Sequence, residues 1–285
     1  MAFTLAVAGK GGTGKTTLAG LLIQTLIERG EGPVLAVDAD PNPNLGYALG
    51  CQVEKSISEL RDELLDHIRK LPPGVTKDDY LEMGIQECLW EGRGVDLLAM
   101  GAGEGPRCYC AVNSVLRRCI DRLRGAYRYV VMDNEAGLEH LSRCTTQDVD
   151  VLLIVSNGTP VSLQAASRIR ELTRKLALRI GRQYLVVNDV DVAPNGEGSC
   201  GSPGAAPSLR SALKGAAIQL AQQTGLELLG IVPSDNRLRE LSREGEPLSQ
   251  LGQDSPARRS LQEILEAALS PTAAATYGVA KRAAG

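Results

Sequence analysis

Residues 9–16 read Gly9-Lys10-Gly11-Gly12-Thr13-Gly14-Lys15-Thr16 and match the pattern G-x-x-x-x-G-K-[ST]. They follow a short apolar run, Thr4–Ala8, and lead into Lys15–Arg29, whose apolar side chains recur at helical spacing. In such a loop, glycines let successive backbone N–H groups point at phosphate oxygens, and the following helix adds the positive end of its dipole. The stretch therefore predicts a strand, a phosphate-binding loop and a helix.

The polar residues of this loop have separate tasks in triphosphate binding. Lys15 is expected to reach the β- and γ-phosphates, and Thr16 to place its hydroxyl on Mg²⁺. The same glycines also fit G-x-G-x-x-G, and Asp38 ends the next apolar run, as a ribose-binding acid would in a dinucleotide fold. Lys15 and Thr16 favour the triphosphate, because a dinucleotide fold has no use for Lys-Thr there. The residues expected to bind the nucleotide phosphates are Gly11, Gly12, Thr13, Gly14, Lys15, Thr16 and Thr17.

Apolar runs alternate with amphipathic segments along most of the chain. The runs are short, continuous and often β-branched, which is typical of strands buried on both faces. Beyond the first, they lie at Val34–Val37, Val95–Met100, Tyr129–Met132, Val151–Val155, Tyr184–Val187 and Leu228–Val232. Further helices are expected at Val112–Leu123, Ser162–Leu178, Ser208–Thr224 and Pro256–Leu269. The alternation predicts an α/β fold with a mostly parallel sheet of about seven or eight strands and helices on both faces.

The motifs spread from residue 9 to residue 235, which predicts one domain over residues 1–270. Ser270–Gly285 is Ala-rich without a strong apolar stripe, so residues 271–285 are expected to be a flexible tail. Ser56–Gly92 and Val190–Pro207 carry no motif that we can match.

Composition argues against several classes of partner. Aromatic residues make up 3% of the chain, the net charge is −3 and no basic block stands out, so nucleic acid is not an expected partner. No apolar run reaches membrane-spanning length, and the N-terminus enters a strand directly, so no membrane partner and a cytoplasmic location are expected. In a reducing compartment, the seven cysteines are expected to be free thiols or metal ligands.

Two acidic motifs follow predicted strands. Asp38 and Asp40 follow the second strand, and Asp133 ends the strand that begins at Tyr129. Ligands of doubly wound sheets lie at the carboxyl ends of the strands, so these acids are expected near the γ-phosphate. Asp38 is expected to act through Mg²⁺ and its waters, and Asp133 to hold Mg²⁺ through water. The alternative is that each acid only forms a turn.

Lys10 gives the loop a second, early lysine. The stretch from Lys10 to Thr17 thereby resembles the deviant Walker A loop of the MinD/ParA/nitrogenase-iron-protein class. The resemblance implies that Lys10 reaches across a two-fold dimer to the partner's nucleotide, and that Asp40 positions or deprotonates the attacking water. It makes Lys10, Lys15 and Asp40 the expected catalytic residues.

The same class suggests how the base is bound. An Asn at the position of Asn188 reads the adenine edge in that class, and the segment that holds Pro233 and Asp235 resembles the one that closes over the base. Either position could instead be a simple strand end.

Cys108 and Cys110 form a C-x-C pair after a Gly-rich run. Alternate residues of an extended loop point to one side, and thiolates suit Ni²⁺, Zn²⁺ or Fe–S clusters. Two sulfurs are too few for a closed tetrahedral site, but a two-fold dimer with both pairs near its axis would supply four. Unligated thiols are the alternative.

Taken together, these motifs resemble the CooC family of nickel-insertion ATPases over residues 1 to about 240. The motifs are the deviant loop, Asp38-Ala39-Asp40-Pro41, Cys108-Tyr109-Cys110 and Asp133-Asn134-Glu135-Ala136-Gly137-Leu138-Glu139-His140-Leu141. The resemblance implies a homodimer that uses ATP/ADP, Mg²⁺ and Ni²⁺ or Zn²⁺, with carbon monoxide dehydrogenase or acetyl-CoA synthase as client. Two alternatives stay open: an Fe–S electron-transfer ATPase, which Cys144 would suit as a cluster ligand, and a positioning ATPase with incidental cysteines.

Overall fold

The computed structural model describes residues 2–67, 74–101, 118, 120–135, 148–175, 179–191 and 209–270, without the side chains of residues 67 and 209–216. In this part of the chain, an eight-stranded sheet runs in the order β3-β4-β2-β5-β1-β6-β7-β8. All neighbouring strands are parallel except β3 and β4, which are antiparallel. The strands are β1 Phe3–Gly9, β2 Val34–Ala39, β3 Leu89–Glu91, β4 Val95–Ala99, β5 Tyr129–Asn134, β6 Asp148–Ser156, β7 Arg179–Val190 and β8 Glu227–Pro233.

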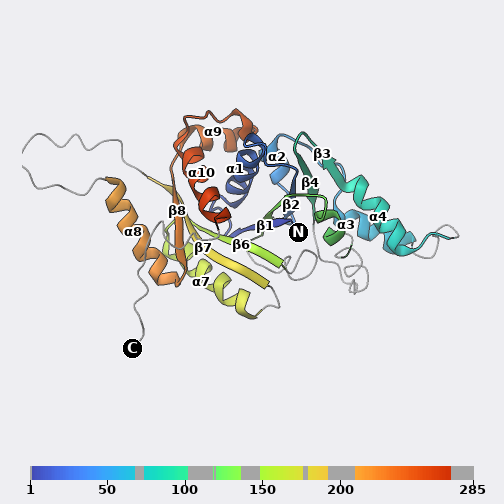
Figure 1. The fold of residues 1–285 in the computed structure, drawn as a ribbon, viewed down its shortest axis with the longest axis horizontal. Coiled ribbons are helices and arrows are strands. Elements are labelled where there is room, and N and C mark those ends of the chain that lie inside the picture. Colours follow the sequence, from blue (N-terminus) through green and yellow to red (C-terminus); the bar gives the residue numbers. More distant parts are fainter. Residues whose placement is uncertain are drawn as a thin grey trace, which may run out of the picture.

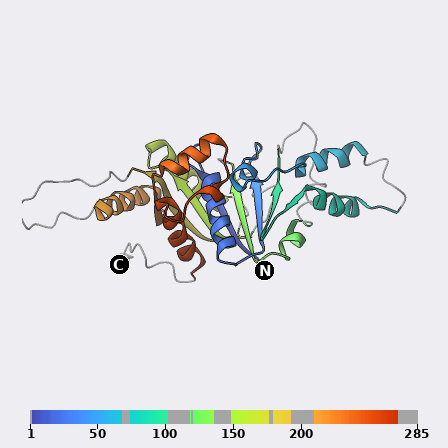
Figure 2. The same cartoon turned by 90° about the horizontal axis from the view of Figure 1, so that it is seen from above.

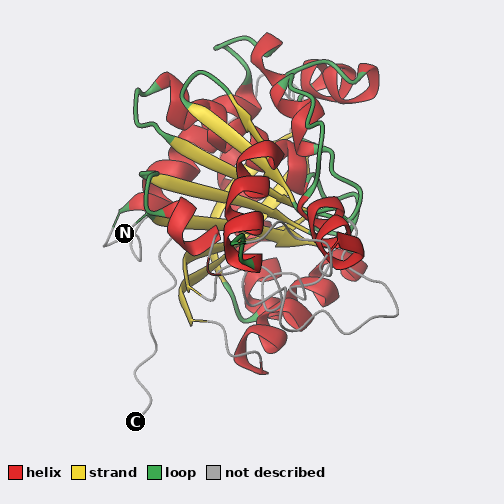
Figure 3. Cartoon of the chain, turned by 90° about the vertical axis from the view of Figure 1, so that its right-hand side faces the viewer, coloured by secondary structure: helices red, strands yellow, loops and turns green. Residues whose placement is uncertain are grey.

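Helices cover both faces of the sheet (Figures 1 and 3). Their bounds are α1 Lys15–Glu28, α2 Leu45–Leu49, α3 Ile57–His67, α4 Lys77–Cys88, α7 Pro160–Lys175, α8 Leu209–Thr224, α9 Asn236–Glu244 and α10 Pro256–Leu269, with a 3-10 turn at Leu248–Gln250. One buried cluster joins α1, α2, α9 and α10 to one face, and the other joins α3, α4, α7 and α8 to the opposite face. The predicted fold class is therefore confirmed.

Alternating side chains of β1 explain how one strand supports both clusters. Leu5 and Val7 belong to the α1 side, whereas Ala6 and Ala8 belong to the α7 side. All four side chains are fully buried, as expected of a central parallel strand. This places the loop after β1 at the middle of the sheet edge, where ligands of doubly wound folds bind.

The segment Ser56–Gly92, which carried no motif, contains α3, α4 and β3. The pair α3 and α4 extends beyond the sheet on the side of β3 (Figure 2). Thr76 begins α4 with a capping box, because its hydroxyl accepts from the Asp79 N–H while the Asp79 carboxylate accepts from the Thr76 N–H. These helices cover the α7 side of the sheet through Leu60, Leu64 and Leu81.

Candidate nucleotide-binding site

The phosphate loop connects β1 to α1 with two glycines in left-handed conformations. Gly12 has a φ of 79° and Gly14, directly before α1, a φ of 87°. A side chain at Gly14 would also meet the amide of Asn188, so only glycine fits there. The Thr13 hydroxyl donates to the Lys10 carbonyl oxygen at 2.8 Å and closes the loop on itself. The N–H groups in the first turn of α1 have no acceptor within the helix. Together with the loop, they form a surface suited to phosphate.

The two lysines of the loop differ in burial. Lys15 is 8% exposed, and its charge lowers the pKa of Asp133 in β5. The two side chains are therefore close enough to interact electrostatically. Lys10 is exposed at the tip of the loop. Lys15 is therefore buried in the site of its own chain, while Lys10 is open to solvent.

Asp38 and Asp133 lie opposite each other in the register of β2 and β5. Their exposed fractions are 0% and 1%. Burial is the main cause that raises the pKa of Asp38 to about 6 and the pKa of Asp133 to about 7. The proximity of the two carboxyls adds to the rise at Asp133, whereas a contact with the Thr16 hydroxyl lowers it. A cation bound beside these two buried acids would stabilise their charged forms.

The residues present fit Mg²⁺. Asp133 Oδ1 is buried without a hydrogen-bond partner among the described residues. A carboxylate and the Thr16 hydroxyl are hard oxygen ligands of the kind that Mg²⁺ takes. The described residues contain no group of three or more His, Cys, Asp or Glu that could hold a metal.

Asp38 and Asp40 form a linked turn after β2. Asp38 accepts from the Leu45 N–H at 2.8 Å and from the Asp40 N–H at 3.1 Å. Asp40 in turn accepts from the Asn42 N–H at 2.9 Å, and its side chain is half-buried. The turn places Asp40 at the same sheet edge as the phosphate loop. This position fits a role as a turn residue and also a role in catalysis.

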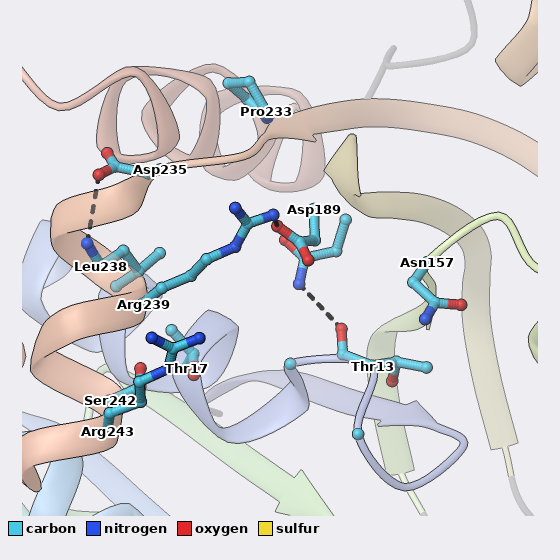
Figure 4. A pocket seen from close by; sticks show the side chains of 13 residues that line it. Thr13, Thr17, Asn157, Asp189, Pro233, Asp235, Leu238, Arg239, Ser242 and Arg243 are labelled. Carbon is cyan, nitrogen blue, oxygen red and sulfur yellow. Dashed lines mark hydrogen bonds and ion pairs between the residues drawn. The ribbon is translucent and has the colours of Figure 1, made fainter. Parts of the chain in front are cut away.

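A pocket of about 280 Å³ opens beside the phosphate loop (Figure 4). It brings together residues from five segments: Gly12, Thr13, Gly14, Thr17, Asn157, Asn188, Asp189, Pro233, Asp235, Leu238, Arg239, Ser242 and Arg243. Of these, the sequence predicted the loop residues, Asn188, Pro233 and Asp235. It did not predict Asn157, Asp189 or the α9 residues. The pocket residues from 235 to 243 recur at i, i+3 and i+4 spacing, so a single face of α9 lines the pocket.

Asn188 and Asp235, two residues predicted to contact the base, make other contacts in the structure. The amide Nδ2 of Asn188 donates to the Thr13 carbonyl oxygen at 2.8 Å and fastens β7 to the phosphate loop. Asp235 caps α9 by accepting from the Leu238 N–H at 3.2 Å, and its other oxygen accepts from the Ser255 hydroxyl at 2.5 Å. Their contact with adenine stays a prediction.

Asp189 links the end of β7 to α9 at the pocket. Its φ of 58° is unusual for a residue other than glycine, and it lies where the register of β7 and β8 shifts. Its carboxylate accepts from Arg239 at 2.6 Å and from the Ser234 hydroxyl at 3.0 Å. The end of β7 is thereby tied to the start of α9.

The predicted metal ligands Cys108 and Cys110 lie outside the described residues, as do Cys119, Cys144, Cys200 and His140. Of the described cysteines, Cys51 and Cys88 are desolvated, which raises their pKa to about 11 and about 12. Without a metal, both thiols therefore stay protonated at neutral pH. Within the described part of the chain, no helix is long and apolar enough to cross a membrane.

Comparison with known proteins agrees with this geometry. Residues 4–185 match the family model described as an AAA domain. The chain is 38% identical to an uncharacterized ATP-binding protein of Methanocaldococcus jannaschii, over 92% of this chain and 96% of the relative. It is 30% identical to the carbon monoxide dehydrogenase accessory protein CooC of Rhodospirillum rubrum, over 96% of this chain and 99% of the relative. The MinD cell division protein of Aquifex aeolicus has a similar fold, with a TM-score of 0.63 at 21% identity over 93% and 95% of the two chains.

The matched region contains the phosphate loop, both acidic motifs and the strands that position them. ATP and Mg²⁺ are the ligands expected of this family, and the loop and the buried acids provide for both. The chain has the fold of the MinD cell division protein and belongs to the AAA-domain family of P-loop ATPases.

Proposed function

We propose that this protein is an ATP-hydrolysing metallochaperone that dimerises with nucleotide. In this proposal, Cys108 and Cys110 of two chains bind Ni²⁺ or Zn²⁺ at the dimer interface, and hydrolysis assists nickel insertion into carbon monoxide dehydrogenase or acetyl-CoA synthase. The similarity over 96% of this chain to CooC, a carbon monoxide dehydrogenase accessory protein, supports the client, and the C-x-C pair supplies ligands suited to the metal.

The observation that carries the proposal is a hydrogen-bonded link between the acidic turn and the end of β4, the strand that precedes the cysteine pair in the sequence. β4 ends beside β2, with Ala99 opposite Asp38 in the register. The next residue, Met100, donates its N–H to the Asp38 carbonyl oxygen at 2.8 Å, and its own carbonyl oxygen accepts from the Ser58 N–H at 3.0 Å. The chain therefore leaves β4 beside the acidic turn, on the N-terminal side of Cys108 in the sequence.

The chemistry follows from the residues at the sheet edge. Thr16 and Asp133 would hold Mg²⁺, which neutralises charge on the β- and γ-phosphates. Lys15 would hold its own nucleotide's phosphates, while Lys10 would act on the nucleotide of the partner subunit. Asp40 would orient the attacking water and accept its proton. Loss of the γ-phosphate would relax the acidic turn, which is the event that could open a shared metal site.

The test is metal analysis of anaerobically purified protein, with its mass in solution measured with and without ATP. We expect Ni²⁺ or Zn²⁺ at one ion per two chains, and an ATP-dependent shift from monomer to dimer. A brown protein that contains iron and sulfide would instead identify an electron-transfer ATPase. Dimerisation with ATP but without bound metal would identify a positioning ATPase and contradict the metallochaperone role.

A further inference from the structure

Three arginines of α9 differ in how their charge is balanced. Arg237 pairs with Glu240 at 3.2 Å, and Arg239 pairs with Asp189 at 2.6 Å and with Asp191 at 3.5 Å. No hydrogen bond or ion pair joins Arg243 to any residue that the structure describes. Of the three, Arg243 is the one whose guanidinium has all its donors available.

Arg243 lines the pocket beside the phosphate loop. Arg239 of α9 lines the pocket too, together with Gly12, Gly14 and Thr17 from the phosphate loop and the start of α1. Arg239 and Arg243 both leave α9 on the side that faces the loop (Figure 4). Arg237 does not line the pocket. A cation that has no acidic partner among the described residues therefore lines a site that is built for an anionic ligand.

The position of α9 is fixed at both ends. Asp235 caps its N-terminus and is bonded to Ser255, Leu241 is fully buried, and Gly245 closes the C-terminus in a left-handed conformation. The Arg239–Asp189 ion pair holds the same helix to the end of β7. The guanidinium of Arg243 is thus carried on a rigid element, which lowers the entropy lost when it binds a ligand.

We propose that Arg243 is a nucleotide-binding residue that donates to phosphate oxygens of the bound nucleotide from the α9 side of the pocket. The inference rests on the proposed ATP binding. A planar guanidinium with five donors suits phosphate oxygens, and charge-assisted hydrogen bonds of this kind are the strong ones. Arg243 also lies in the last turn of α9, where a cation interacts favourably with the helix dipole, so the test must separate that structural role from binding.

The experiment measures the Kd of Mg-ADP for the full-length parent, Arg243→Gln, Arg243→Lys and Arg237→Gln. Arg237→Gln removes the same charge from the same helix, away from the pocket. We expect Arg243→Gln to weaken binding about tenfold, as loss of one charge-assisted hydrogen bond would. Arg243→Lys should bind more tightly than Arg243→Gln, and Arg237→Gln should stay within about twofold of the parent. Equal losses in Arg243→Gln and Arg237→Gln would overturn the proposal.

Competition by inorganic triphosphate identifies the group that Arg243 contacts. If Arg243 binds phosphate oxygens, triphosphate should lose affinity for Arg243→Gln by a similar factor. A loss confined to ADP would assign Arg243 to the base or ribose and overturn the phosphate assignment. Apo Tm values that match between Arg243→Gln and Arg243→Lys would show that the variants fold alike. A parent protein that binds neither ligand would overturn the proposed ATP binding itself, a result distinct from any difference among variants.

Discussion

At the scale of single residues, the two loop lysines occupy different environments. Lys15 is largely buried beside Asp133, whereas Lys10 is exposed at the loop tip. A buried lysine with an acidic neighbour can serve the phosphates of its own subunit only. An exposed lysine can reach another molecule, which is the arrangement that the deviant loop implies.

We predict that Lys15→Ala abolishes nucleotide binding, while Lys10→Ala leaves the Kd of ADP within about threefold of the parent and stops hydrolysis. The reason is that Lys15 holds the phosphates of its own site and Lys10 acts across the dimer. Equilibrium binding and steady-state ATPase assays measure both effects. Lys175→Ala, at an exposed position on α7, is the control. An unchanged ATPase rate in Lys10→Ala would contradict the role of Lys10 in the partner's site.

Asp40→Asn should bind ATP normally but hydrolyse it roughly a hundredfold more slowly, because the carboxamide keeps the side-chain shape and removes the proton acceptor. Its Oδ1 can still accept from the Asn42 N–H, so the turn should persist. Single-turnover kinetics with pre-bound ATP separate this loss from a loss of affinity. Normal turnover would leave Asp40 as a turn residue only. Asp254→Asn, on an exposed loop, is the matched control.

Residue roles that depend on local pattern were predictable, and those that depend on tertiary contacts were not. Gly14 follows from the loop pattern and has the left-handed φ that the pattern requires. The hydrogen bond from Asn188 to the Thr13 carbonyl oxygen joins residues 175 positions apart, and no local pattern encodes it. The same holds for Asp189 with Arg239, whose pairing arises only when β7 and β8 lie side by side.

At the scale of elements, the apolar strands were the predictable part and the polar helices were not. Each predicted apolar run lies within or overlaps a strand, from β1 to β8. β3 was not predicted because it has only three residues and pairs at the sheet edge. The helices α3, α4 and α9 were not predicted because their sequences are rich in charge, and each buries only a narrow stripe.

The packing of α4 on α3 leads to a stability prediction at Gly84. A Cβ added there would collide with the side chain of Leu60, which is 1% exposed and whose Cγ would lie 3.1 Å away. Overpacking of this kind costs about 1–3 kcal/mol, more than the roughly 1 kcal/mol by which Ala exceeds Gly in helix propensity. We therefore expect Gly84→Ala to lower the free energy of unfolding by about 1 kcal/mol, measured by urea denaturation.

The control for this prediction is the neighbouring residue. Met83 is 69% exposed, so Met83→Ala should change stability by less than about 0.5 kcal/mol. The Kd of ADP should be unchanged in both variants, since α4 does not line the pocket. A Gly84→Ala protein as stable as the parent would show that α3 and α4 can move apart to fit the added methyl group without a loss of free energy of unfolding.

At the scale of the whole molecule, the sheet connects the nucleotide site to the segments around it. β2 and β5 carry the two buried acids, and β4, on the far side of β2, precedes the cysteine pair in the sequence. The phosphate loop lies at the centre of the same edge. A hydrogen bond therefore joins the acidic turn at Asp38 to Met100, at the end of the strand that precedes the cysteine pair in the sequence.

Metal binding and dimerisation should be coupled. If Cys108 and Cys110 of two chains form one site, bound Ni²⁺ or Zn²⁺ should number one per dimer, and binding should weaken as the pH falls because the ligands are thiolates. Each chain alone offers two sulfurs, so metal should promote dimerisation, and ATP-driven dimerisation should raise metal affinity reciprocally. A Cys108→Ser/Cys110→Ser protein should bind ATP normally and lose both the metal and metal-dependent dimerisation. A Cys51→Ser protein should keep both, because Cys51 is a separate free thiol outside the proposed pair. Metal stoichiometry and sedimentation of the three proteins decide the matter, since one tightly held ion per monomer, or unchanged metal in the double variant, is incompatible with a shared four-sulfur site.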